Sequence, residues 1–108
     1  MATINDGLNL ARAEKRLAEL IGIEEQYERA YRVAERRHNA AFRYIDGRAE
    51  VDGRPYSMNE YRYFASLARE ADSKLSIVRG KVDAMRATVD SLKMRVYAAC
   101  DGDRMVSV

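Results

Sequence analysis

His38 and Cys100 are the single histidine and the single cysteine of the sequence, and they are the side chains best suited to metal binding or nucleophilic chemistry. The helical pattern described below separates them by about 50 Å, because a helix rises about 1.5 Å per residue. They cannot share a metal ion, and one cysteine cannot form an internal disulfide. We therefore predict no metal and no cofactor. Cys100 is interpreted as a small apolar residue near the helix seam. His38 is interpreted as a satisfied or partly exposed seam histidine, with a buried pH sensor or a register-setting residue as the alternative.

Pairs of carboxylates are the next candidates for chemistry. Glu24 and Glu25 are adjacent, so on a helix they point to different faces. Glu25 and Glu28 share a face, but Arg29 and Arg32 beside them indicate solvated ion pairs. The sequence also lacks a glycine-rich phosphate loop and a serine close to the histidine. It therefore predicts a protein that is not an enzyme and has no small-molecule substrate.

Arginines and tyrosines gather in the middle of the chain. Residues 29–69 contain nine arginines and five acidic residues, and six tyrosines lie in or beside this window. Arginine and tyrosine are enriched at protein interfaces, but they also grip phosphates and stack on nucleic-acid bases. An ordinary solvated face with tyrosines in the core is a third interpretation. The protein-interface interpretation predicts the contact residues Arg36, Arg43, Arg54, Tyr44, Tyr56 and Tyr63.

A first long helix is expected over residues 6–45, with Asn5 or Asp6 as its N-terminal cap. Apolar residues recur at the seven-residue spacing of a coiled-coil seam, which is interrupted only by Glu24 and His38. The two seam rows are Leu10, Leu17, Glu24, Tyr31, His38, Ile45 and Ala13, Leu20, Tyr27, Ala34, Ala41.

A second long helix is expected over residues 57–100, ending at Asp101-Gly102. Ser57 and Glu60 have the capping-box spacing, in which each side chain binds the other residue's backbone N–H. Two apolar rows then continue over six heptads, which predicts a left-handed coiled-coil seam. The rows are Tyr61, Ala68, Leu75, Val82, Val89, Val96 and Phe64, Ala71, Val78, Met85, Leu92, Ala99.

The connector between the helices contains two Asp-Gly dipeptides, of which the first is a helix stop and the second favours a tight turn. The turn could close a short β-hairpin of residues 49–51 against residues 54–56. An irregular loop is equally compatible with the sequence, because Pro55 removes one donor of the β-ladder.

Two helices of equal length on either side of one connector must pack antiparallel. The fold class that follows is all-α, an antiparallel two-helix coiled-coil hairpin. In this arrangement Gly22 and Gly80 lie at one level, and each glycine costs about 1 kcal/mol against alanine inside a helix. They indicate a local kink or the close approach of another chain there, unless they are two unrelated, tolerated glycines.

The bulk composition limits the class of protein. The 108 residues, a third of them charged and with a net charge of +2, fit one helical domain over 1–108 with flexible termini at 1–5 and 102–108. The sequence has neither an apolar run of about 18 residues nor the features of a signal peptide. We therefore expect a cytoplasmic protein with no membrane partner.

Apolar residues also lie off the two seams, and a lone two-helix hairpin buries too little surface to be very stable. We therefore predict a second contact face and a homo-oligomer in which hairpins assemble into a helical bundle. The off-seam residues are Ile21, Ile23, Val33, Phe42, Tyr44, Tyr63, Leu67, Ile77, Met94 and Tyr97.

The stretch from Ala49 to Ser57, which leads into a capped helix, resembles the short β-hairpin between two helices in small bacteriophage head–tail joining proteins of the gpW type. The resemblance covers about 20 of the 108 residues, and both helices are longer here, so no functional residue is carried over. It implies a structural or accessory protein of a phage or mobile element.

These observations predict a non-enzymatic protein that binds protein chains, its own included, through the Arg/Tyr-rich turn end. Such a protein would be a virion component or a small inhibitor that docks on a host complex. The alternative is a nucleic-acid-binding or nucleoprotein-associated helical protein that uses the same arginines. Salt separates the two, because phosphate contacts weaken steeply as salt rises.

Overall fold

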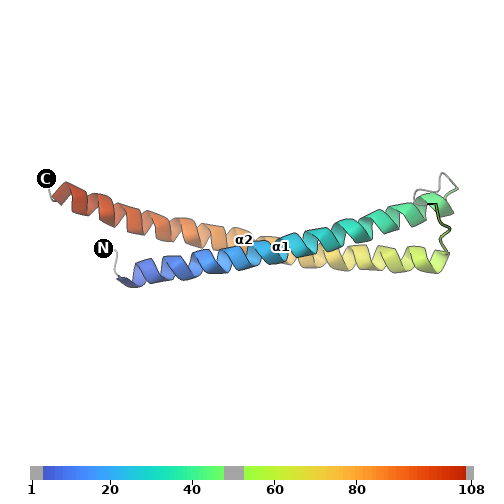
Figure 1. Cartoon of the computed structure of the whole chain (residues 1–108), viewed down its shortest axis with the longest axis horizontal. Helices are drawn as coiled ribbons and strands as arrows, with labels where there is room; N and C mark the ends of the chain where they lie inside the picture. Colours follow the sequence, from blue (N-terminus) through green and yellow to red (C-terminus); the bar gives the residue numbers. More distant parts are fainter. Residues whose placement is uncertain (1–3, 48–52, 107–108) are drawn as a thin grey trace. The chain divides into compact units, whose positions relative to one another are not determined.

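The computed structural model describes the backbone of residues 4–47 and 53–106 and the side chains of residues 5–47 and 53–98. Two helices make up this part of the chain: α1 spans Ile4–Ile45 and α2 spans Met58–Val106. Figure 1 shows α1 in blue to green and α2 in yellow to red. The prediction of an all-α fold is confirmed, and the described residues contain no strand.

The chain divides into two compact units, each of which contains a stretch of both helices. The turn unit is Ile23–Val78, and the terminal unit is Met1–Gly22 together with Arg79–Val108. Within each unit the two helices pack against each other and run in opposite directions, which confirms the antiparallel hairpin. Both helices continue without interruption through both units.

The core of each unit lies on the predicted heptad rows. Ten apolar side chains of the described residues are buried, and eight of them occupy seam positions. In the terminal unit these are Ala13, Leu20, Val82 and Val89, and in the turn unit they are Ala34, Ala41, Leu75 and Val78. The repeat identifies them because seven residues make nearly two helical turns and so return to the same face. The other two buried residues, Ala40 and Tyr56, lie off the rows.

Among the described residues, two apolar seam positions are exposed, and the two polar seam positions are half-buried. Tyr27 and Ile45 are apolar but each is 36% exposed, and Ile45 is the last residue of α1. Glu24 and His38, the two predicted interruptions, are half-buried. His38 stacks on Tyr61 with ring centroids 5.1 Å apart and planes inclined by 29°, so an aromatic face covers the imidazole.

The end of α1 follows the predicted stop. Gly47 has a φ of 73°, a conformation that glycine adopts at little cost. The N–H of Asp46 donates to the carbonyl of Phe42 at 2.9 Å, and the N–H of Gly47 donates to the carbonyl of Tyr44 at 3.1 Å. These bonds satisfy carbonyls that the helix end leaves without helical partners.

Two other predicted helix ends are wrong. Helix α1 begins at Ile4, so Asn5 and Asp6 lie in its first turn instead of capping it, where the Asp6 carboxylate complements the helix dipole. Helix α2 continues to Val106, beyond the expected stop at Asp101-Gly102. One glycine costs a helix only about 1 kcal/mol, so a glycine alone does not end it.

The connector is described only in part. One arm of the expected β-hairpin, residues 49–51, lies outside the described residues, while residues 54–56 are present and do not form a strand. Gly53 has a φ of 72°, as expected for a glycine in a tight turn.

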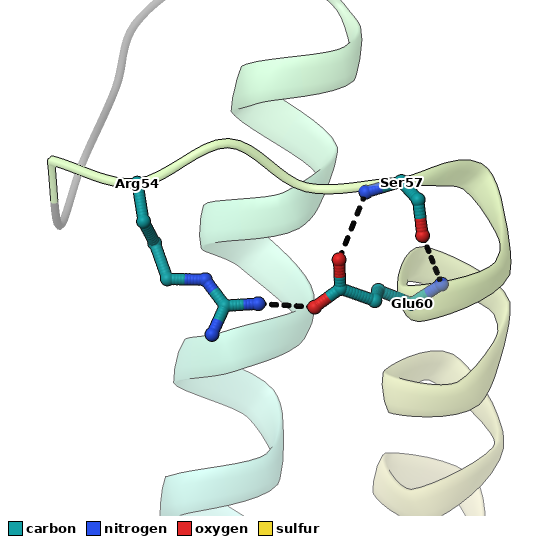
Figure 2. Close-up of polar contacts among 3 residues, drawn as sticks. All are labelled: Arg54, Ser57 and Glu60. Atoms are coloured by element: carbon teal, nitrogen blue, oxygen red, sulfur yellow. Dashed lines mark hydrogen bonds and ion pairs between the residues drawn. The ribbon is translucent and has the colours of Figure 1, made fainter.

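The predicted capping box starts α2 (Figure 2). The N–H of Glu60 donates to Ser57 Oγ at 3.1 Å, and the N–H of Ser57 donates to Glu60 Oε1 at 3.2 Å. The N–H of Tyr61 makes the first helical bond, to the Ser57 carbonyl at 3.0 Å. The reciprocal bonds satisfy backbone donors that the first turn of a helix otherwise leaves unpaired.

Replacing Ser57 with alanine should lower the free energy of unfolding by about 1 kcal/mol, because the Glu60 N–H loses its acceptor. Thermal denaturation followed by circular dichroism measures this loss. Ser76→Ala is the matched control, since Ser76 is exposed within α2 and alanine is the better helix former. An equal loss in both variants would contradict the capping role.

Replacing Gly22 or Gly80 with alanine should raise the free energy of unfolding by up to about 1 kcal/mol each. A Cβ atom added at either glycine meets nothing within 4 Å, and neither has a positive φ. Gly47→Ala should instead destabilise the protein, because its φ of 73° strains any other residue. Urea unfolding compares the three variants. A loss of stability in Gly22→Ala would instead support the close approach of another chain at that position.

Candidate functional site

Tyr56 ties the connector to both helices. Its side chain is 6% exposed and packs with Ala40 and Ala41, whose small size leaves room for a ring. Tyr44 of α1 and Phe64 of α2 meet the Tyr56 ring edge to face, with centroids 6.3 and 6.1 Å away. We call these three aromatic residues, Tyr44, Tyr56 and Phe64, the connector cluster.

Arg54 lies on the outside of the connector cluster. Its Cζ atom is 4.3 Å from the centroid of the Tyr56 ring, within the range of a cation–π interaction. Its guanidinium also donates to Glu60 Oε2, the same carboxylate that completes the capping box (Figure 2). Arg54 and Tyr56 were predicted to contact a partner. In the structure Arg54 binds Glu60 and lies on the Tyr56 ring, and Tyr56 is buried against residues of its own chain.

A second group of rings consists of Tyr61, His38 and Phe42. Besides stacking on His38, the Tyr61 ring lies 6.2 Å from that of Phe42, which is 43% exposed. Tyr61 therefore lies against both His38 and Phe42. The described residues contain no group of three His, Cys, Asp or Glu side chains that could hold a metal ion.

A groove of about 710 Å³ lies between α1 and α2 within the turn unit. We call it the turn-unit groove. Its lining is mostly apolar and includes three alanines, which keep the surface low between larger side chains. The lining residues are Tyr27, Arg29, Ala30, Val33, Ala34, Arg37, Tyr63, Phe64, Leu67, Glu70, Ala71 and Lys74.

Large side chains in this groove remain exposed in the isolated chain. Tyr63 is 60% exposed and Val33 is 52% exposed, and the Tyr63 ring lies 5.6 Å from that of Phe64. Tyr27 lines the groove as well, which accounts for its exposure despite its seam position. Contiguous exposed apolar surface with a polar rim is typical of an interaction site.

The charged lining residues make the groove basic. Glu70 binds Lys74 in an ion pair of 3.2 Å, so these two charges compensate each other. The Cζ atom of Arg37 lies 5.9 Å from the centroid of the Phe64 ring. Neither Arg29 nor Arg37 is paired with a carboxylate of the described residues. The groove therefore presents two uncompensated positive charges beside apolar surface.

The six predicted contact residues fall in three places. Tyr63 lines the groove, Tyr44 and Tyr56 belong to the connector cluster with Arg54 beside them, and Arg36 and Arg43 are exposed on α1. Arg43 occupies the last turn of α1, where a positive charge complements the helix dipole.

The predicted contact residues include only Tyr63 of the groove lining, so they omit Val33, Leu67 and the two arginines, Arg29 and Arg37. Val33 and Leu67 were visible as apolar residues off the seams, one on each helix. The seam register could have placed both on one side of the hairpin.

The terminal unit has a smaller hollow of about 310 Å³, lined by Arg16, Leu20, Lys81, Ala84, Met85 and Thr88. Its lining lacks aromatic residues. Neither helix, over its described residues, has a stretch that is both long and apolar enough to cross a membrane.

The chain was compared with protein families, with curated proteins and with solved structures. None of these comparisons finds a match. The resemblance to gpW-type proteins therefore stays a prediction from the sequence.

Proposed function

We propose that this chain is a non-enzymatic protein that acts by binding another protein through the turn unit. The turn-unit groove is the observation that carries the proposal, because it leaves Val33 and Tyr63 exposed beside arginines. Tyrosine and arginine are among the residues that most often dominate binding energy at protein interfaces. The setting that we propose is a phage or mobile element, with the chain as a virion component or a small inhibitor of a host complex.

Replacing Tyr63 with alanine should lower capture of the partner at least tenfold, as expected for an exposed tyrosine at the centre of an interface. The measurement is quantitative affinity purification from cells of the source organism, followed by mass spectrometry. Tyr97→Ala is the matched control, because Tyr97 is also 60% exposed but belongs to the terminal unit. The proposal fails if no protein is captured, or if both variants capture it equally.

Nucleic-acid binding is the second candidate, and the exposed arginines of α1 favour it. Arg29, Arg36 and Arg43 are spaced by seven residues, so they form one basic row. Phosphate contacts would give a mobility shift with DNA or RNA at about 50 mM salt that disappears as salt rises. The absence of a shift at about 50 mM salt would remove this candidate.

Self-association into a helical bundle is a separate part of the proposal, supported by the exposed apolar residues of the described chain. Sedimentation at low micromolar concentration measures it. A dimer or larger species supports the bundle, whereas a monomer of 12.3 kDa would exclude it.

A further inference from the structure

We propose that the occupant of the turn-unit groove is a single amphipathic helix of a separate protein, with acidic residues on the flank that faces Arg29 and Arg37. The inference rests on the proposed function, because it specifies the partner of the same surface. It is carried by the dimensions of the groove, by its alanines and by its uncompensated charge.

The groove has the dimensions of a seat for a helix. Its lining spans residues 27–37 of α1 and 63–74 of α2, which is about 16 Å or three helical turns. Ala30, Ala34 and Ala71 are small enough to let another helix axis approach closely. A third helix laid there would bury Val33 and Tyr63, as helices do in other hydrophobic grooves.

The positive charge of the groove favours acidic residues on the side of the incoming helix that faces Arg29 and Arg37. Arg29 and Arg37 lie eight residues apart on α1, so their backbones are about 12 Å apart along the helix axis. Glutamate or aspartate residues about two turns apart on the incoming helix match this distance. Arginine binds carboxylates in a bidentate geometry, which makes these two positions suited to choose an acidic flank.

A second copy of this chain fits the groove less well. Two identical grooves meeting face to face would each carry a net positive charge from Arg29 and Arg37, and like charges at an interface oppose association. Nucleic acid would satisfy the arginines, but its phosphates would leave the apolar lining between them unburied.

The experiment is a selection of displayed helical peptides on the full-length protein. The probe is a library of amphipathic helices of about 18 residues, with leucines at fixed seam positions and Glu, Gln or Lys at the flanking positions. We expect Glu-flanked helices to be enriched and to bind about tenfold more tightly than their Lys-flanked counterparts at low salt. The inference is overturned if no helix is enriched, or if the Lys-flanked or Gln-flanked helices bind as tightly.

A charge reversal provides the decisive control. In Arg29→Glu/Arg37→Glu, the same library should yield Lys-flanked helices, because the flank now faces negative charge. Arg86→Glu/Arg95→Glu, which changes two exposed arginines of the terminal unit, should retain the preference for Glu. Unchanged selection in the groove variant would overturn the inference, and circular dichroism of each variant verifies its helical content.

The failure of this inference is distinguishable from failure of the proposed function. If capture of the natural partner requires Tyr63 but is unchanged in Arg29→Glu/Arg37→Glu, the acidic helix is wrong and protein binding stands. If capture requires neither, both are wrong. A dimer of this chain that Tyr63→Ala dissociates would also overturn the assignment to a separate helix.

Discussion

Replacement of Leu75 with alanine is expected to lower the free energy of unfolding by about 3 kcal/mol. Leu75 is 1% exposed and is one of the two largest fully buried side chains of the described residues. Leucine and alanine are both good helix formers, so the loss comes from packing and from the cavity left behind. Because the core is a narrow seam, the melting temperature of the variant should lie well below that of the parent protein.

Ile77→Ala is the matched control for Leu75→Ala. Ile77 lies two residues further along α2 and is 62% exposed, so its removal should change stability by less than about 0.5 kcal/mol. Thermal and urea unfolding of both variants measure the difference. Similar losses at residues 75 and 77 would contradict the seam register of α2.

Replacement of Tyr56 with alanine is expected to cost about 3 kcal/mol, the lower end of the range for large buried aromatic residues. The change removes a ring that packs on Ala40 and Ala41 and meets two other rings edge to face. It also removes the surface on which the Arg54 guanidinium lies. The connector would then no longer be fixed to the helices that it joins.

Two further tyrosine variants test the reason for this loss. Tyr56→Phe keeps the ring, so it should cost less than about 1.5 kcal/mol. Tyr63→Ala should leave stability within about 0.5 kcal/mol of the parent, because Tyr63 is 60% exposed. Urea unfolding of the three variants gives the comparison. A stable Tyr56→Ala protein would show that the connector cluster does not hold the turn.

These stability measurements also separate the two roles of the tyrosines. Tyr56 was predicted to contact a partner, yet its ring is buried within the chain, so its loss should act through folding. Tyr63 should act through binding, with little change in stability. If Tyr63→Ala fails to fold, its loss of partner capture can no longer be attributed to the groove.

The heptad repeat by itself predicted eight of the ten apolar side chains that are buried among the described residues. Leu75, Val82 and Val89 follow one another at seven-residue intervals, and each is buried. The capping box and the stop at Gly47 were equally visible, because both depend on bonds between residues within four positions of each other. Local chemistry and periodicity are properties of the sequence, so no tertiary information was needed.

Only the tertiary structure determines which side chains beside the seam are buried and which are exposed. Ala40 lies off both rows and is buried with Tyr56, since the connector brings that ring back onto α1. The groove likewise requires Val33 of α1 and Tyr63 of α2 to lie on one side of the hairpin. The sequence shows that such residues are apolar or aromatic. Whether a given ring is buried or exposed depends on contacts between segments distant in the chain, and only the packed helices fix those contacts.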